Sequence, residues 1–310
     1  APFSLSPYAM PESVFEKMAE LTVPFNELMI KVSRNTDFLI QHLEPIAAID
    51  PFLKMLLKCR SKEINQNCQL LIQRNDFFIA NVKHNDYKQN TTPTNEITEE
   101  SVLRQVELNT VSASFPFLIT RLYQLHKNLF EQNKLPKVIQ NNPLDAVVDA
   151  FAHSVQNYGI SDSVILVVVQ SNEKNIFDQI GLQQHLWIKH NIATVRKTLV
   201  EIHKDGKLRQ GHLVLDGKTV ALTYFRAGYT PDDFPEEQAF KGRQLIEASS
   251  TIQVPDMGMQ LSGMKKIQQV LTKKEVLADF VSTEISGIFL KTFAKMHTLD
   301  EIINTSEGKV

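Results

Sequence analysis

The feature that most constrains the fold of this chain is the uninterrupted aliphatic run Val-Ile-Leu-Val-Val-Val over residues 164–169. A strand that is apolar on both faces needs a layer of helices on each face, as in parallel α/β sheets. An amphipathic helical pattern over residues 177–190 and a second short apolar segment over residues 192–195 follow this run. Strand, helix and strand in this order predict a parallel βαβ unit, so we expect an α/β fold.

The chain beyond residue 200 continues this mixture of strands and helices. Two apolar segments, residues 212–215 and 220–225, flank Asp216-Gly217, a dipeptide typical of two-residue hairpin turns, and they predict two antiparallel strands. Beyond Pro255 the spacing becomes helical again. We expect one helical face there to carry Leu277, Phe280, Val281, Ile285, Ile288 and Phe289.

The chain before residue 160 is mainly helical in its pattern. Apolar residues at helical spacing predict one helix over residues 15–28, bent at Pro24, and another over residues 38–43, ended by Pro45. Later helices are expected over residues 118–129 and from Asn142 as N-cap, with Pro143 at the first helical position, to about Tyr158.

Two extended segments interrupt these helices, at residues 69–72 and 105–110. Between them, residues 83–100 are polar, contain Asn, Thr, Pro and Glu, and show no periodicity. This composition predicts an exposed loop between two strands.

The charge of the chain argues against polyanionic partners. It has 33 basic and 35 acidic side chains and a net charge of −2, without the basic cluster that nucleic-acid or anionic-membrane binding requires. The aliphatic run over residues 164–169 is far shorter than the roughly 20 residues that span a bilayer, and no signal-peptide pattern is present. We therefore expect a soluble, cytoplasmic protein that binds neither nucleic acid nor membranes.

The two cysteines fit that expectation. Cys59 and Cys68 lack the spacing of a zinc site, so we expect reduced thiols. The sequence opens with Ala1-Pro2-Phe3 and not with Met, which indicates a processed, cut or cloned fragment.

Glu107 and Asn109 lie two residues apart on a predicted strand, so their side chains point the same way while Leu108 faces the core. A carboxylate beside an amide oxygen suits a hard cation such as Mg²⁺, which completes its shell with phosphate and water. The pattern therefore points to a magnesium and nucleotide site. An exposed polar strand face fits the same spacing.

Other polar segments follow the ends of predicted strands, where α/β proteins place ligands. Residues 111–114 (Val-Ser-Ala-Ser) offer hydroxyls and backbone amides, and residues 226–229 (Arg-Ala-Gly-Tyr) offer a guanidinium that could clamp a carboxylate. Arg74 also follows an extended segment, and Lys265 and Lys266 open a predicted helix. Ordinary turns and solvated cations are the simpler interpretation of each segment alone.

Taken together and in order, these segments resemble the eukaryotic glutathione synthetases. The resemblance extends from Ala1 to about Met296. The matching segments are Gln-Val-Glu-Leu-Asn-Thr-Val-Ser-Ala-Ser-Phe at 105–115, Asn-Ile-Phe-Asp-Gln at 175–179, Tyr-Phe-Arg-Ala-Gly-Tyr at 224–229 and Gly-Met-Lys-Lys-Ile-Gln-Gln at 263–269.

The resemblance implies a cytosolic, homodimeric ligase with an ATP-grasp-type fold that joins γ-glutamylcysteine and glycine through an acyl phosphate, using ATP and Mg²⁺. It implies a mainly helical part over residues 1–160 that carries the Glu107/Asn109 strand. A parallel-sheet α/β substrate-binding domain would follow over residues 161–262, and a helical segment over residues 263–310 would lead into an ATP-grasp lobe.

The resemblance also assigns site residues. Glu107 and Asn109 would hold magnesium, Glu107 and Lys265 would bind ATP, and Arg74, Glu107 and Lys265 would be catalytic. The peptide-substrate pocket would be lined by Arg74, Val111, Ser112, Ala113, Ser114, Glu173, Lys174, Asn175, Gln179, Arg226, Ala227, Gly228 and Tyr229.

Several positions depart from the family pattern. Pro116-Phe117 replaces two glycines and adds aromatic bulk beside the serines, Ala227 replaces an acidic residue, and Lys174 replaces an arginine. We expect these changes to weaken substrate binding or alter its selectivity. The family's glycine-rich ATP loop has no counterpart before Val310, so we expect this chain alone to be inactive.

Two functional hypotheses remain from the sequence. One is part of a glutathione synthetase whose remaining lobe is encoded downstream. The other is a relative that binds γ-glutamyl peptides but has lost ATP chemistry or changed its specificity. A generic nucleotide-binding α/β domain is disfavoured, because no Gly-x-Gly-x-x-Gly follows the first strand.

Overall fold

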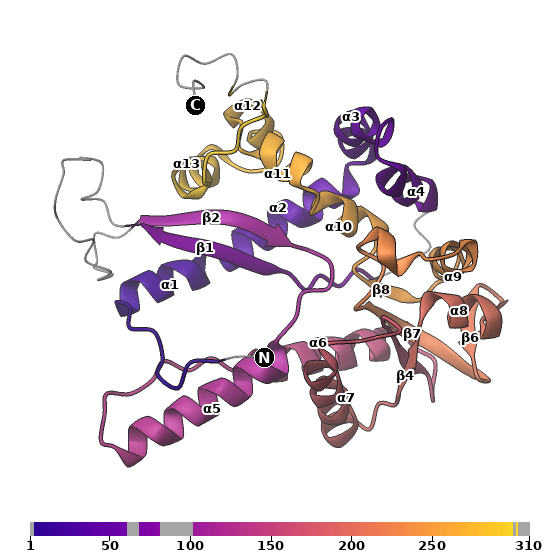
Figure 1. The fold of residues 1–310 in the computed structure, drawn as a ribbon, viewed down its shortest axis with the longest axis horizontal. Coiled ribbons are helices and arrows are strands. Elements are labelled where there is room, and N and C mark those ends of the chain that lie inside the picture. Colours follow the sequence, from indigo (N-terminus) through magenta and orange to yellow (C-terminus); the bar gives the residue numbers. More distant parts are fainter. Residues whose placement is uncertain (1–2, 61–67, 81–101, 300–301, 303–310) are drawn as a thin grey trace. The chain divides into compact units, whose positions relative to one another are not determined.

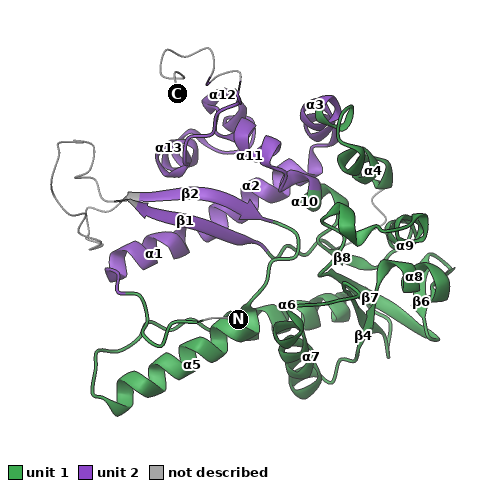
Figure 2. Cartoon of the chain, viewed as in Figure 1, with its two compact units in different colours: residues 1–8, 46–72, 110–260 green, residues 9–45, 73–109, 261–310 purple. Residues whose placement is uncertain are grey.

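The computed structural model describes residues 3–60, 68–80, 102–299 and 302, and Figure 1 shows their fold. The loop predicted over residues 83–100 lies outside the described residues. The chain forms two compact units, each built from separated segments (Figure 2). Unit 1 contains residues 1–8, 46–72 and 110–260, and unit 2 contains residues 9–45, 73–109 and 261–310. The three-part division expected from the resemblance stays a prediction.

Unit 1 is organised around a six-stranded sheet. Its central strand β3 (Val164–Val168) pairs in parallel with β4 (Thr194–Lys197) on one side and β7 (Lys218–Phe225) on the other. Helix α7 (Ile176–His190) connects β3 to β4, which confirms the predicted parallel βαβ unit. The remaining strands are β5 (Lys207–Arg209), β6 (His212–Leu215) and β8 (Ile252–Val254).

Helices cover both faces of this sheet, as the apolar run requires. On one face, Ile165 and Val167 of β3 pack in a core cluster with residues of α6 (Pro143–Tyr158) and α7. On the other face, Val164 and Leu166 pack with residues of α8 (Leu199–Asp205) and α9 (Glu237–Glu247). Every residue of β3 is therefore buried.

The predicted hairpin between β6 and β7 is also confirmed. Leu215 pairs with Lys218, so the turn consists of Asp216 and Gly217 alone. Their φ angles are +50° and +79°, the left-handed conformation that two-residue turns of this kind need at both positions. Asp and Gly tolerate that conformation better than other residues.

Unit 2 is built on an antiparallel strand pair, β1 (Arg74–Ala80) and β2 (Val102–Asn109). The stacked rings of Phe25 and Phe289, with centroids 4.3 Å apart, lie in its core. Its helices include α1 (Glu12–Glu20), α2 (Thr22–Arg34), α11 (Lys265–Leu271), α12 (Lys274–Leu277) and α13 (Thr283–Thr292). Of the remaining α-helices among the described residues, α4 (Pro51–Cys59) and α5 (Pro116–Gln132) belong to unit 1. Helices α3 (Thr36–Ala47) and α10 (Met257–Ser262) each cross a boundary between the segments of the two units.

Both proline-based boundaries in the N-terminal helices were wrong. The expected bent helix is two helices that meet at Leu21, and Pro24 lies in the first turn of α2, where its missing N–H costs no helical bond. Pro45 lies inside α3 and does not end it. A proline so close to the C-terminus removes only one hydrogen bond from the last turns.

The other element boundaries differ more locally. No strand forms over residues 69–72, and the extended segment is β1, which starts at Arg74. The apolar face expected after Pro255 is divided between α12 and α13, and Ile288 is exposed. Asn142 does precede α6, but its side-chain oxygen accepts a hydrogen bond from Thr120 and does not cap the helix.

Both cysteines are free thiols, as expected from their spacing. Burial raises the pKa of the Cys59 thiol to about 12, so this residue is an inert core side chain. Among the described residues, none of the helices combines the length and apolar character needed to cross a membrane.

Candidate active site

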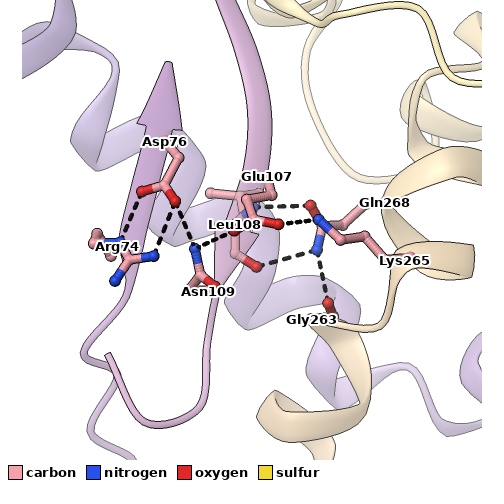
Figure 3. Close-up of polar contacts among 8 residues, drawn as sticks. All are labelled: Arg74, Asp76, Glu107, Leu108, Asn109, Gly263, Lys265 and Gln268. Atoms are coloured by element: carbon pink, nitrogen blue, oxygen red, sulfur yellow. Dashed lines mark hydrogen bonds and ion pairs between the residues drawn. The ribbon is translucent and has the colours of Figure 1, made fainter. Parts of the chain in front are cut away.

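The end of β2 presents the predicted polar pair as expected. Leu108 is buried, while Glu107 and Asn109 lie on the opposite side of the strand, and the Asn109 amide nitrogen donates to Glu107 Oε1 at 3.2 Å. Gln268 of α11 fixes the strand from the other side (Figure 3). It accepts a hydrogen bond from the Leu108 N–H at 2.8 Å and donates to the Leu108 carbonyl at 3.1 Å.

This connection between α11 and β2 places Lys265 beside Glu107. Lys265 is the first residue of α11, and its ammonium forms an ion pair with Glu107 Oε2 (Figure 3). The cation expected at the phosphates and the carboxylate expected at the metal are therefore neighbours, and the Gln268 side chain ties α11 to the backbone of β2 beside them.

A second carboxylate completes the cluster in unit 2. Arg74 pairs in register with Asn109, and its guanidinium binds both oxygens of Asp76, at 2.8 and 2.9 Å. The Asn109 amide nitrogen also donates to Asp76, at 3.1 Å. The hydrogen bond from Arg74 is the main reason that the pKa of Asp76 is lowered. Arg74 is thus the first residue of β1, and not the residue after a strand.

The oxygens gathered here fit a hard cation. Asn109 uses its nitrogen to bridge the carboxylates of Asp76 and Glu107, which leaves its oxygen outside those bonds. Within the described part of the chain, no three His, Cys, Asp or Glu side chains group as a complete metal site. Two carboxylates and an amide suit Mg²⁺, which binds through few protein oxygens and retains water or phosphate.

In unit 1, the segment after β2 is tied to the end of β7. The Ala113 carbonyl accepts hydrogen bonds from the Tyr224 hydroxyl and from Arg226 Nη1, both at 3.0 Å. The Ser112 hydroxyl donates to the Arg226 carbonyl at 3.3 Å. Val111 and Ser114 lie on the same segment but make none of these bonds.

Asp178 of α7 fixes the following turn. Its buried carboxylate accepts the N–H groups of Phe115, Phe117 and Leu118, at 2.8, 3.1 and 3.1 Å, and so caps α5 from a neighbouring helix. A Cβ on Gly181 would lie 2.2 Å from the Phe117 ring. The aromatic bulk expected beside the serines is therefore accommodated against α7.

The segment 226–229 leaves β7 in a held conformation. Arg226 is buried, and its guanidinium lies 5.7 Å from the Tyr224 ring centroid. Asp233 accepts the N–H groups of Gly228, Tyr229 and Thr230, at 2.8, 3.0 and 3.2 Å. Gly228 has a φ of +95°, which favours glycine there.

The loop between β3 and α7 carries the remaining candidates. Glu173 accepts the N–H of Asn175 at 2.8 Å, and Gln179, on the first turn of α7, is buried and accepts a hydrogen bond from Arg196. Lys174 is exposed, and Ala227 is buried.

Among the residues of these clusters that sequence reasoning missed are Asp76, Asp178, Arg196 and Asp233. Asp76 is one period-two step from Arg74 on β1, and Asp178 stands inside the motif over residues 175–179, so both had a signal in the sequence. Arg196 had none, because it lies one residue beyond the apolar segment over residues 192–195 and joins the strand only in the structure.

The mixed sheet covered by helices on both faces, with the buried Arg226 directly after β7, defines an α/β protein. Residues 1–309 match the family described as eukaryotic glutathione synthase, ATP binding domain. The chain belongs to this family.

The chain is similar to several curated glutathione synthetases. It is 37% identical to the chloroplastic enzyme of Solanum lycopersicum, over 97% of this chain and 54% of that protein. It is 34% identical to the Dictyostelium discoideum protein and 30% identical to the Homo sapiens protein, again over 97% of this chain, covering 64% and 62% of theirs. The chain thus spans less than two thirds of these relatives.

A solved structure confirms the fold. The apo form of a glutathione synthetase-like effector from Globodera pallida superimposes with a TM-score of 0.73 at 19% identity, covering 94% of this chain and 63% of that one. The helical region and the parallel-sheet region expected from the sequence are therefore features of a glutathione synthetase-like fold.

Proposed function

We propose that this chain is part of a glutathione synthetase, in which it binds γ-glutamylcysteine and takes part in its ATP- and Mg²⁺-dependent ligation with glycine. The observation that carries this proposal is the cluster of Glu107, Asn109 and Lys265, which comes from two matched segments distant in sequence. The family match over residues 1–309 supports the same function.

In this proposal, Glu107 and Asn109 hold Mg²⁺, and Lys265 binds the nucleotide phosphates. Bound Mg²⁺-ATP supplies the activated phosphoryl group that the ligation requires. Glu107 and Lys265 neutralise each other in the structure. Each therefore exchanges its partner on binding, the carboxylate for the metal and the ammonium for phosphate, so neither charge is left unpaired.

The substrate pocket in the proposal comprises the segments at the ends of the strands of unit 1. Arg226 has a donor, Nε, with no hydrogen-bond partner among the described residues, and this donor is available for a substrate carboxylate. Asp233 and the Ala113 carbonyl hold the two segments beside it. Arg74 belongs to unit 2, and its proposed substrate contact rests on the family resemblance alone.

The test is glutathione formation from γ-glutamylcysteine, glycine, Mg²⁺ and ATP by the complete protein that contains this chain. Glu107→Gln keeps the shape of the side chain but removes its charge, so we expect activity to fall by at least about 100-fold with an unchanged circular dichroism spectrum. Glu275→Gln, at an exposed position on α12, is the matched control and retains activity. An active Glu107→Gln protein at ordinary magnesium concentration contradicts the proposed metal site.

A second function, binding of γ-glutamyl peptides without ligation, is favoured by one observation. Ala227 is buried at the pocket segment, where the family usually has an acidic residue, so one charged group is missing there. Binding of γ-glutamylcysteine by the complete wild-type protein, without glutathione formation, supports this alternative.

The homodimer and the cytosolic location are further parts of the proposal. Helix α7 exposes Phe177, Trp187 and Ile188 by 74%, 56% and 78%, an apolar surface that supports association with a second copy. Two of the similar plant proteins are named chloroplastic, so localisation is tested separately by imaging the tagged complete protein.

A further inference from the structure

Several buried side-chain atoms near the carboxyl edge of the unit 1 sheet have no hydrogen-bond partner among the described residues. They are Glu173 Oε2, Asn175 Nδ2, Gln179 Nε2, Arg196 Nη1 and Arg226 Nε. A buried polar atom left without a hydrogen bond is destabilising, so a group of them indicates a place that a ligand fills. Carboxyl ends of parallel strands are also where α/β sheets bind ligands.

Arg196 reaches this group from β4. In the register of the sheet, Arg196 is opposite Val167 of β3, and Val167 is opposite Tyr224 of β7. All three side chains therefore share the sheet face that α7 covers. Burial lowers the pKa of the Arg196 guanidinium, and the nearby charge of Glu173 opposes that shift.

The hydrogen bond between Arg196 and Gln179 fixes the orientation of the Gln179 side-chain amide. Arg196 Nη2 donates to Gln179 Oε1 at 2.9 Å. A guanidinium can only donate, so the amide must turn its oxygen to Arg196. Its NH₂ group then points away and has no partner in the part of the chain that the structure describes, with Gln179 only 2% exposed.

The unpaired groups divide into hydrogen-bond donors and one acceptor. Gln179 Nε2, Asn175 Nδ2 and Arg226 Nε are donors, while Glu173 Oε2 is an acceptor with a negative charge. Donors suit a carboxylate, and an anionic acceptor suits an ammonium. This combination matches the head group of an α-amino acid, which carries both ions on one carbon.

We propose that Arg196 is a positioning residue that sets the specificity of the substrate pocket. It holds the Gln179 amide so that the NH₂ group faces the α-carboxylate of the γ-glutamyl group, and its charge balances Glu173. The inference rests on the proposed function, because the γ-glutamyl group is the ligand that brings this head group.

The test uses calorimetric titration of the complete protein with two probes. One is γ-glutamylcysteine, and the other is N-(4-aminobutanoyl)cysteine, which lacks only the α-carboxylate. A hydrogen bond to a charged group corresponds to about a 10- to 100-fold difference in Kd, which is the preference expected of the wild type. Arg196→Met removes the bond that orients Gln179, so this preference should fall by about tenfold.

Two further variants make the result specific. In Gln179→Glu the new carboxylate still accepts a hydrogen bond from Arg196 but has no N–H to donate to the substrate. The preference for γ-glutamylcysteine over the probe without the α-carboxylate should therefore fall below one. This variant keeps the test valid even if Arg196→Met fails to fold. Lys197→Met is the control: this neighbouring residue points to the opposite face of the strand, where it pairs with Asp205 and Asp216, and its loss should leave the preference unchanged.

The outcomes separate this inference from the proposed function. A wild type that does not bind γ-glutamylcysteine overturns both. A wild type that binds both probes equally, or a folded Arg196→Met protein that keeps the wild-type preference, overturns the role of Arg196 and leaves the proposed function standing.

Discussion

At the residue scale, the guanidinium of Arg226 in the proposed site is held by more than one contact. Arg226 uses Nη1 to hold the Ala113 carbonyl and its guanidinium lies over the Tyr224 ring, so the group is fixed before any ligand binds. Such an arrangement reduces the side-chain entropy lost on binding. The carboxylate clamp expected from the sequence stays a prediction, in which Nε, unpaired among the described residues, is the donor for the substrate.

Arg226→Ala should weaken γ-glutamylcysteine binding by about 2 to 4 kcal/mol, or roughly 30- to 700-fold in Kd, the scale of truncating one partner of a desolvated charge pair. Arg226→Lys should also bind more weakly than the wild type, because an ammonium lacks the planar fork. Calorimetric titration of the three proteins measures this, with circular dichroism to confirm folding. Equal affinities would show that Arg226 is only structural.

The lowered pKa of Asp76 predicts that the stability of the protein depends on pH. Its pKa is lowered in the folded state, so its pairing with Arg74 stabilises the protein above the unfolded pKa of about 3.9 and is lost as the pH falls through the folded pKa. Both side chains are partly exposed, which limits the effect to less than about 1 kcal/mol. Asp76→Asn should reduce the loss of stability between about pH 5 and pH 3 in urea titrations. If Asp76→Asn loses as much stability over this pH range as the wild type does, the ion pair makes no such contribution.

At the element scale, α5 and α7 are connected by a buried carboxylate and a close ring contact. Asp178 caps α5, and Gly181 gives room to Phe117. Both residues belong to α7, whose first turn also carries Gln179. The packing of these two helices therefore positions one side of the proposed pocket.

Asp178→Ala should lower the free energy of unfolding by about 2 to 3 kcal/mol, because three N–H groups lose a charged acceptor. The measurement is chemical denaturation. Asp145→Ala, an exposed first-turn acid on α6, is the matched control and should cost less than about 1 kcal/mol. A similar cost for both variants would mean that the Asp178 cap contributes no more than a surface charge.

Gly181→Ala should destabilise the protein by about 1 to 3 kcal/mol, since the new methyl group collides with the Phe117 ring. Phe117→Leu in the same chain should recover part of that loss. The interaction energy of the double-mutant cycle is the relevant quantity, and additive effects would contradict the contact.

The sequence predicted elements well where the pattern was local. The aliphatic run over residues 164–169 and the Asp216-Gly217 turn each specify their own structure, and both were confirmed. The start of β1 was missed because it depends on pairing with β2, and Arg196 was missed because its contact with Gln179 arises only when β4 packs beside α7. Contacts of this kind are tertiary and leave no short-range periodicity.

At the scale of the whole molecule, the exposed side chains of α7 determine the expected assembly. Trp187 and Ile188 are large apolar residues on a helix that otherwise covers the sheet. An apolar helical surface of this kind is typical of an interface between protein copies.

Ile188→Lys should shift the complete protein from dimer to monomer, because a charge would be buried at the interface. Sedimentation velocity at several concentrations measures the change. Lys204→Glu, on α8, alters surface charge on another helix and should leave the dimer intact. A wild-type protein that is already monomeric would contradict the proposed homodimer.

The discontinuous units have a consequence for synthesis of the chain on the ribosome. Every strand of the unit 1 sheet has been made once residue 254 has emerged. The core of unit 2, in contrast, joins Phe25 to Phe289, so its N-terminal helices must wait for almost the whole chain. During that interval the apolar faces of α1 and α2 lack their final partners. Nascent chains stalled so that β8 has emerged from the ribosome but Phe289 has not should therefore already protect β3 from protease, while α2 stays open to cleavage and to chaperones.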